Sequence, residues 1–180
     1  MKKSNQKQLT VEDIKTVELK DYKDLGYDDS QRFEASLYIN EQRVAIVSND
    51  GGGGNHHYLW FDGRDKTEKV LHEYLHKLIK EGRFDETYKY YVEDIFPDGE
   101  APPIETFMGI DDYINQLIDE FNLKKECKRN TCYTLHSDEW GVHQGYKEPY
   151  SKKTKLMLIE MYGENLKEIL NERFVEPIEI

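Results

Sequence analysis

Apolar and polar residues alternate along the first third of the chain in a way that predicts β-strands. The clearest case is the segment FEASLYIN at 33–40, in which every second residue is apolar, followed by a turn at 40–43. The segment 22–30 is polar and predicts a loop. The expected strands are Ile14–Leu19, Phe33–Ile39, Val44–Ser48 and Tyr58–Phe61. Together they predict an antiparallel β-meander.

The periodicity then changes to that of a helix. Thr67–Glu81 has apolar residues at positions i, i+3, i+4 and i+7, and Gly82 ends it. The later segments are expected to be helices at Phe84–Ile95 and Ile110–Phe121, a hairpin of Thr131–Leu135 with Trp140–Tyr146, a helix at Lys155–Tyr162 closed by Gly163, and a short helix at Leu166–Leu170. This order predicts an α+β fold, with an N-terminal antiparallel β-meander followed by helices, a second β-hairpin and C-terminal helices. We expect one domain over residues 1–180, with residues 1–8 as a disordered tail.

The 180-residue chain is acidic, with a net charge of −11, and its charge is unevenly distributed. Asp85–Glu120 contains eleven acidic residues and one basic residue, a net charge of −10, whereas Phe121–Glu160 has a net charge of +3. Because the acidic segment repels phosphates, we expect no direct contact with nucleic acid. The segment suits either a solvated helix face or docking on a basic protein surface.

The chain has no sequence feature of membrane insertion or export. No apolar run is long enough to span a bilayer, and the polar residues 1–8 are followed by no apolar segment. Two cysteines, Cys127 and Cys132, are fewer than a disulfide-stabilised secreted domain usually has. We therefore expect a cytoplasmic protein with reduced thiols. A single C-x4-C spacing is a poor zinc signal, and Cys132 is more typical of a packed core thiol, so neither a metal nor a cofactor is expected.

The sharpest catalytic motif is His72-Glu73-x-x-His76, which lies on the expected helix at 67–81. Two histidines four residues apart share a helix face and can bind Zn²⁺, and the intervening glutamate can act as a general base. This makes a zinc metallohydrolase one alternative. However, at about 100° per residue the motif lies opposite the apolar stripe and faces solvent. The simpler interpretation is an exposed helix face that matches the motif by chance.

The glycine-rich segment Asn49–Asn55, with the sequence NDGGGGN, cannot form regular structure. Successive backbone N–H groups can bind an anion, which makes a nucleotide-signal sponge a second alternative. The segment lacks the Lys-Ser/Thr of a P-loop and precedes an expected strand, whereas phosphate sites usually precede a helix. A mobile, exposed hairpin loop is the simpler interpretation.

The chain also resembles a known group of proteins. The segment FEASLYINEQRVAIVSNDGGGGN at 33–55 resembles a family of small uncharacterised proteins of bacterial phages, plasmids and integrative elements. The acidic helix and the closing segment YGENLKEILNERF at 162–174 look similar as well. The resemblance implies no particular chemistry, and the group does not generally carry H-E-x-x-H. It implies a protein encoded on a mobile element, and small acidic proteins of such elements are often counter-defence inhibitors, including anti-CRISPR proteins.

These observations favour a binding protein over an enzyme. We expect an acidic inhibitor of a host defence protein, with an RNA-guided CRISPR nuclease as the main candidate because its nucleic-acid channel is basic. The expected contact surface consists of the acids Asp94, Asp98, Glu100, Asp111 and Asp112 and of the loop and strand residues Asn49, Asp50, His57, Tyr58 and Trp60. The acidic side chains are expected to point outward, so that charge reversal leaves the fold intact. The sequence leaves the oligomeric state open.

Overall fold

The computed structural model of the chain describes residues 9–61, 64–85, 87–89, 92, 103–104 and 108–180. The chain divides into two compact units, residues 1–117 (unit 1) and 118–180 (unit 2), and each is described by itself. The expectation of a single domain stays a prediction. Among the described helices, none combines the length and the apolar character that a bilayer crossing requires.

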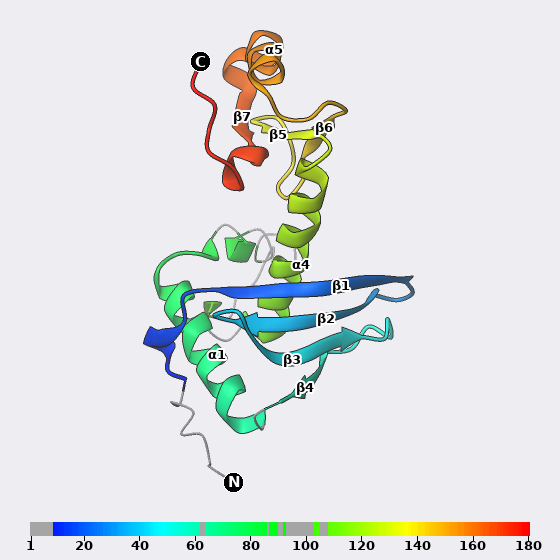
Figure 1. Cartoon of the computed structure of the whole chain (residues 1–180), viewed down its shortest axis with the longest axis vertical. Helices are drawn as coiled ribbons and strands as arrows, with labels where there is room; N and C mark the ends of the chain where they lie inside the picture. The colour runs from blue at the N-terminus through cyan, green and yellow to red at the C-terminus, as the bar shows by residue number, and fades with distance from the viewer. Residues whose placement is uncertain (1–8, 62–63, 86, 90–91, 93–102, 105–107) are drawn as a thin grey trace. The chain divides into compact units, whose positions relative to one another are not determined.

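Unit 1 is built on a four-stranded antiparallel sheet in the order β1-β2-β3-β4, which confirms the expected meander (Figure 1). The strands are β1 (Val17–Tyr27), β2 (Gln31–Ile39), β3 (Gln42–Asn49) and β4 (His57–Trp60). The apolar residues of β2 that alternate in the sequence are all buried, as the pattern predicts: Phe33, Ala35, Leu37 and Ile39. Between β2 and β3, Asn40 and Glu41 have φ angles of 49° and 65°, the left-handed conformation that a tight hairpin turn requires.

Strand β1 is longer than the sequence pattern indicates. The segment from Tyr22 to Tyr27, which the sequence analysis assigns to a loop, continues β1 and pairs with β2. The register shifts between Lys20 and Lys23 and again between Asp24 and Gly26. The loop assignment is wrong here because such bulges interrupt the period-two alternation by which a strand is recognised.

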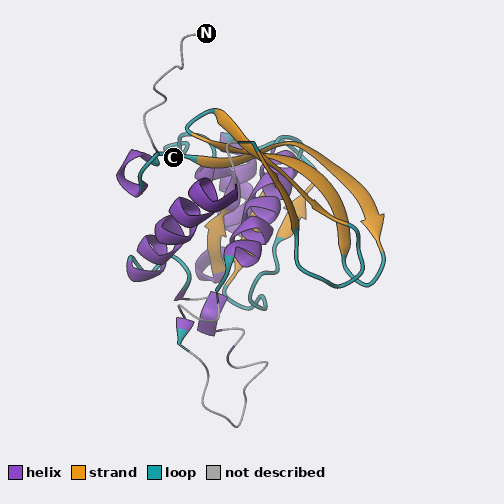
Figure 2. Ribbon diagram, turned by 90° about the horizontal axis from the view of Figure 1, so that it is seen from below, coloured by secondary structure: helices purple, strands orange, loops and turns teal. Residues whose placement is uncertain are grey.

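Two helices cover one face of the sheet (Figures 1 and 2). α1 (Arg64–Lys80) buries Leu71, Leu75 and Leu78, as its apolar stripe predicts, and Gly82 follows with a φ of 72°. The first half of α4 (Ile110–Cys127) buries Ile110, Tyr113 and Ile114. The ring of Tyr113 lies 6.4 Å from that of Tyr74 and 6.1 Å from that of the buried Phe84, so the aromatic rings connect the two helices. Most of the expected helix after Phe84 lies outside the described residues.

Unit 2 is built on a three-stranded antiparallel sheet in the order β6-β5-β7. After the C-terminal half of α4, its elements are β5 (Thr131–Leu135), β6 (Gln144–Tyr146), α5 (Lys152–Tyr162) and β7 (Leu166–Ile169). The expected hairpin is confirmed, with a shorter second strand. α5 is capped by Ser151, whose hydroxyl accepts a hydrogen bond from the backbone N–H of Thr154 at 3.2 Å, and it ends at Gly163 as expected.

The expected short helix at Leu166–Leu170 is instead β7, followed by a 3-10 turn at Leu170–Arg173. β7 pairs with β5, and Ile169 lies opposite Tyr133 in the buried cluster of unit 2. Three apolar residues in five positions fit a strand as well as a helix, because so short a segment does not define a period. Pairing with a strand more than thirty residues earlier in the chain, at Thr131–Leu135, decides between them.

Candidate functional site

The β1–β2 hairpin tip and the β3–β4 loop lie side by side at one end of the four-stranded sheet (Figure 1). The backbone N–H of Ser30 donates to the carbonyl of Gly51 at 3.0 Å, and the N–H of Gly53 donates to the Ser30 hydroxyl at 3.3 Å. We call residues 24–30 and 50–55 together the acidic tip. Its exposed acidic side chains are Asp24, Asp28, Asp29 and Asp50.

Asn49 organises the loop from within. It is only 5% exposed, and its Oδ1 accepts from the backbone N–H of Gly51 at 2.8 Å. Gly51 is also buried and has a φ of 88°, and a Cβ there would lie 2.3 Å from Cγ of Arg32. The expectation of an exposed loop is therefore wrong at Asn49 and Gly51, because these hydrogen bonds and contacts hold the loop against the hairpin. The rest of the loop, from Asp50 and Gly52 onward, is exposed as expected.

The backbone N–H groups of the loop donate to the protein's own side chains. Those of Gly51–Gly53 donate to Asn49, Asp50 and Ser30 at 2.8, 3.1 and 3.3 Å respectively. The aspartates around them also repel phosphate. These three N–H groups of the loop are therefore already paired within the protein, and the nucleotide-sponge hypothesis stays a prediction.

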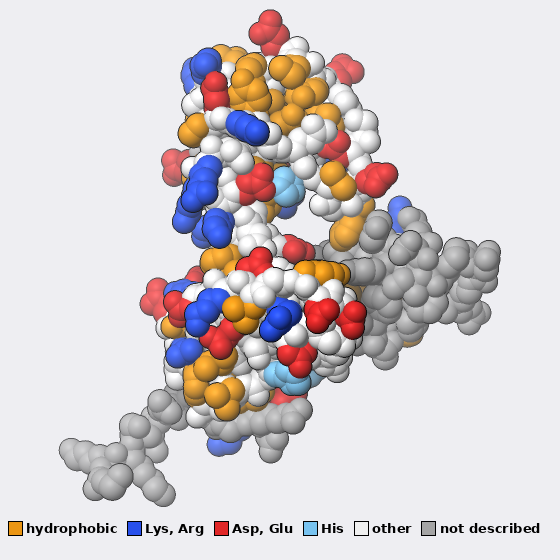
Figure 3. Space-filling model, turned by 90° about the vertical axis from the view of Figure 1, so that its right-hand side faces the viewer, with side chains coloured by type: hydrophobic (Ala, Val, Ile, Leu, Met, Phe, Trp, Pro, Cys, Tyr) orange, Lys and Arg blue, Asp and Glu red, His pale blue; other side chains and the backbone are white. Residues whose placement is uncertain are grey.

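Two apolar side chains project from the acidic tip. Tyr27 is 77% exposed and Leu25 is 53% exposed. Figure 3 views the molecule from the side on which the tip projects, where Asp and Glu side chains are interspersed with Lys and Arg. An exposed aromatic side chain beside charged groups is typical of a protein interface. The sequence analysis missed Leu25 and Tyr27 because they lie in a segment without periodicity.

The expected contact residues on β4 divide into one exposed and two half-buried side chains. His57 is exposed, whereas Tyr58 and Trp60 are half-buried and stack on each other with ring centroids 5.4 Å apart. The Tyr58 hydroxyl donates to Oδ1 of Asp111 at 2.5 Å. Burial and this carboxylate raise the pKa of Tyr58 above its ordinary value. Tyr58 therefore connects β4 to α4, and its expected role in partner contact stays a prediction.

The sequence analysis expects Asp111 and Asp112 to point outward. In the structure both are half-buried at the N-terminus of α4. Oδ2 of Asp111 accepts from the backbone N–H of His56 at 2.9 Å, and Oδ2 of Asp112 accepts from the N–H of Gly109 at 2.8 Å. The expectation is wrong because each carboxylate accepts a hydrogen bond from a backbone N–H group, which holds it against the protein. The other expected acids, Asp94, Asp98 and Glu100, lie outside the described residues.

The three motif side chains His72, Glu73 and His76 are exposed on α1, as the helical geometry predicts. The ammonium of Lys69 lies 3.8 Å from the glutamate of the motif. In the part of the chain that the structure describes, only one set of three His, Cys, Asp or Glu side chains is close enough to share a metal ion, and it lies elsewhere, at Glu126, Cys132 and His143. The metallohydrolase motif thus has no third ligand among the described residues.

Comparison of the chain with protein-family models, with curated proteins and with solved structures found no match. The resemblance to proteins of phages and mobile elements therefore stays a prediction. The function is inferred from the geometry of the chain itself.

Proposed function

We propose that the chain is a non-enzymatic interaction protein of a bacterial mobile element, which docks its acidic tip on a basic surface of a host protein. The observation that carries this proposal is the exposure of Tyr27 and Leu25 among four aspartates at the end of a fixed hairpin. Aromatic side chains dominate the energy of protein interfaces, and charges around them select the partner. The contact surface proposed here is the acidic tip in place of Asp111 and Asp112, whereas Asp94, Asp98 and Glu100 stay predictions.

The partner that we propose is a host defence protein that handles nucleic acid, with an RNA-guided CRISPR nuclease as the first candidate. Such a protein lines a channel with Lys and Arg for the nucleic-acid backbone, and these residues complement the aspartates of the acidic tip. The net charge of −11 also speeds the encounter with a basic partner. The place of action is then the cytoplasm of the bacterial host.

Hydrogen bonds and packing restrain the acidic tip within the protein. Asn49 and Ser30 hydrogen-bond to the loop glycines, and the stem of Arg32 packs over Gly51. Binding through such loops loses less conformational entropy than binding through loops that must become ordered. These restraining contacts therefore support the acidic tip as a docking element.

Pull-down from a host lysate followed by mass spectrometry identifies the partner, and its dissociation constant is then measured with purified proteins. We expect the double variant Asp28→Lys/Asp29→Lys and the variant Tyr27→Ser each to bind at least about tenfold more weakly than the wild type. The control is Glu139→Lys/Glu164→Lys, which makes the same charge change at exposed positions of unit 2. We expect the control to bind within about threefold of the wild type.

The thermal unfolding temperature of every variant is compared with that of the wild type, so that weaker binding is not confused with unfolding. The docking proposal is wrong if the recovered partner is itself acidic. It is also wrong if the charge-reversed tip binds as tightly as the wild type.

A further inference from the structure

Three side chains with metal-ligand chemistry converge in unit 2. Glu126 lies in the last turn of α4, Cys132 in β5, and His143 directly before β6. Their ligand atoms all lie within 4.8 Å of one another, and Oε2 of Glu126 is 3.1 Å from Nε2 of His143. A tetrahedral zinc ion, with bonds of about 2.0–2.3 Å, holds its ligand atoms about 3.3–3.8 Å apart. The three donors are therefore already close to the separation that zinc requires.

The chemistry of the three donors selects among metals. A thiolate and an imidazole are preferred by zinc and by other late transition metals, whereas calcium and magnesium take oxygen ligands. A carboxylate completes many zinc sites. Zinc is therefore the ion that this combination fits best.

The surrounding chain leaves room for the carboxylate and orients it. Gly145 pairs with Cys132 across the β5–β6 ladder, and a Cβ at Gly145 would lie 3.0 Å from Oε1 of Glu126. The side-chain amide of Asn130 donates to the same oxygen at 3.4 Å. Oε1 is thus held by the protein, while Oε2 is turned toward His143, an arrangement typical of an oriented metal ligand.

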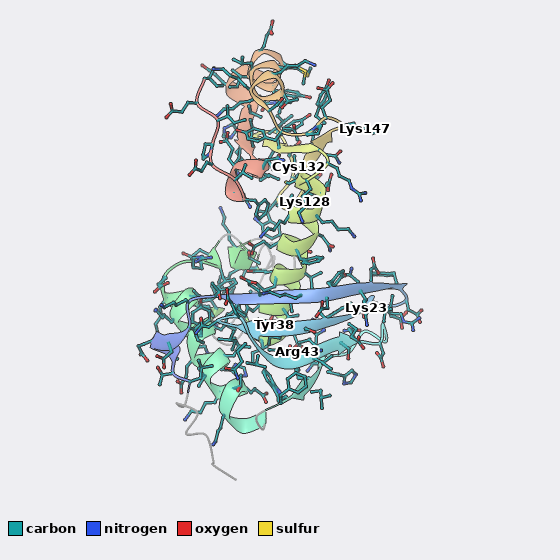
Figure 4. All side chains as sticks on the ribbon, in the orientation of Figure 1. Lys23, Tyr38, Arg43, Lys128, Cys132 and Lys147 are labelled. Atoms are coloured by element: carbon teal, nitrogen blue, oxygen red, sulfur yellow. The ribbon has the colours of Figure 1, made fainter. Side chains whose placement is uncertain are left out.

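The backbone that carries the thiol ligand is held in place. Cys132 lies on β5, the central strand of the small sheet (Figure 4). The buried side chain of Asn171 donates to the carbonyls of Cys127 and Asn130, both at 2.9 Å, and accepts from the N–H of Cys132 at 2.7 Å. A backbone held in this way lowers the entropic cost of assembling a metal site.

We propose that Glu126, Cys132 and His143 bind a zinc ion as its three protein ligands, with water in the fourth position. The ion joins the end of α4, the central strand of the small sheet and the segment before β6. This site is independent of the acidic tip, and either can be absent without the other.

The test is the zinc content of protein purified without chelator, measured by mass spectrometry of the metal. We expect about one zinc per chain in the wild type, as for a single metal site. Because Cys132 is fully buried, the variants that carry the test are His143→Ala and Glu126→Gln, which change side chains that reach the surface. Each is expected to lose at least about tenfold in zinc affinity. Cobalt added to the metal-free wild type should give a thiolate-to-cobalt charge-transfer band, which reports ligation by cysteine.

The matched controls are His136→Ala, an exposed histidine of the same unit, and His72→Ala in the H-E-x-x-H motif. Both are expected to retain zinc. Zinc should also raise the unfolding temperature of the metal-free wild type but not that of His143→Ala, since only a bound ligand stabilises the folded state.

Three results would overturn the assignment. The first is wild-type protein that binds no zinc, including protein in which Cys127 and Cys132 form a disulfide. The second is undiminished zinc binding in both His143→Ala and Glu126→Gln. The third is loss of the zinc in His72→Ala, which would place the ion on α1.

Discussion

At the N-terminus of α4, Asp111 accepts two hydrogen bonds from the chain segment that enters β4. The Tyr58 hydroxyl donates to it at 2.5 Å and the backbone N–H of His56 at 2.9 Å. The ring of His56 is also within hydrogen-bond distance, 3.0 Å, of the side-chain oxygen of Asn115 on the next turn of α4. Charge reversal at Asp111 therefore tests the packing of β4 on α4 and says little about docking.

We expect Asp111→Lys to lower the free energy of unfolding by about 2–4 kcal/mol, because it removes two charge-assisted hydrogen bonds and leaves their donors without an acceptor. Tyr58→Phe removes one of these bonds and is expected to cost about 1–2 kcal/mol. Urea titration measures the free energy of unfolding of both variants. Glu120→Lys, at an exposed position of the same helix, is the control and should stay within about 0.5 kcal/mol of the wild type. Equal stability of the Asp111 and Glu120 variants would contradict this interpretation.

Two glycines of the β3–β4 loop, Gly51 and Gly54, differ in the space available for a side chain. Gly51 has a φ of 88° and no space for a Cβ, whereas Gly54 has no atom within 4 Å of a built Cβ. We expect Gly51→Ala to destabilise the fold by about 1–3 kcal/mol, since alanine is strained at this φ and its methyl group would press on Arg32. Gly54→Ala should be neutral or stabilising by up to about 1 kcal/mol. Thermal unfolding of the two variants measures the difference, and similar values would show that the loop is not held as described.

The C-terminal segment is tied to α5 by a small polar cluster. The ammonium of Lys155 donates to Oε1 of Glu172 and to the carbonyl of Ile178, both at 2.8 Å. The Tyr150 hydroxyl also donates to Glu172 and accepts from the N–H of Ile178 at 3.2 Å. Burial alone raises the pKa of Glu172, but the hydrogen bonds from Lys155 and Tyr150 outweigh it and hold the pKa below its ordinary value.

The lowered pKa of Glu172 makes the free energy of unfolding depend on pH. Because the pKa of Glu172 is lower in the folded state, its contribution is fully present above the unfolded pKa of about 4.3 and is lost as the pH falls through the folded value. We expect Glu172→Gln to lower the unfolding temperature at neutral pH and to differ less from the wild type in acid. Scanning calorimetry from about pH 7 down to about pH 3 follows this difference. A difference that stays constant with pH, or an equal effect of the exposed control Glu164→Gln, would argue against the cluster.

The elements that the sequence predicts are those whose pattern is local. β2 alternates apolar and polar residues, β3 is a short apolar run after a turn, and α1 keeps its helical stripe, so each element can be recognised from its own residues. The second half of β1 and the whole of β7 escape prediction because bulges or pairing with a distant strand determine their conformation. Local pattern is thus sufficient for regular elements and insufficient where tertiary pairing decides.

The candidate sites also contain features that a local sequence pattern predicts and features that only the tertiary structure determines. Asp50 and the glycine loop are visible in the sequence as a run of turn residues. The exposure of Tyr27 depends on where a bulged hairpin ends, and the proximity of Glu126 to His143 depends on how α4 meets the β5–β6 segment. Neither relation has a sequence spacing that could be recognised, because the residues come from separate elements.

For the whole molecule, the net charge of −11 predicts that association with the proposed basic partner depends on salt. We expect the association rate with a basic partner to fall by about tenfold or more between about 50 mM and 500 mM salt, since screening removes the long-range attraction. Stopped-flow fluorescence or surface plasmon resonance measures the rate. Asp28→Lys/Asp29→Lys should show a flatter dependence than the wild type. The same slope for both proteins would mean that the acidic tip does not lead the encounter.

The sheet of unit 1 has two edges, and β1 is the longer edge strand, with 11 residues against 4 in β4. A long, regular edge strand offers its unpaired backbone groups to another molecule and so invites fibril growth. β1 is not regular: its register shifts twice, and Asp21 and Gly26 adopt positive φ angles that turn the backbone away from an extended course. The irregularity that hides β1 from the sequence pattern therefore also disfavours edge-to-edge pairing between folded chains.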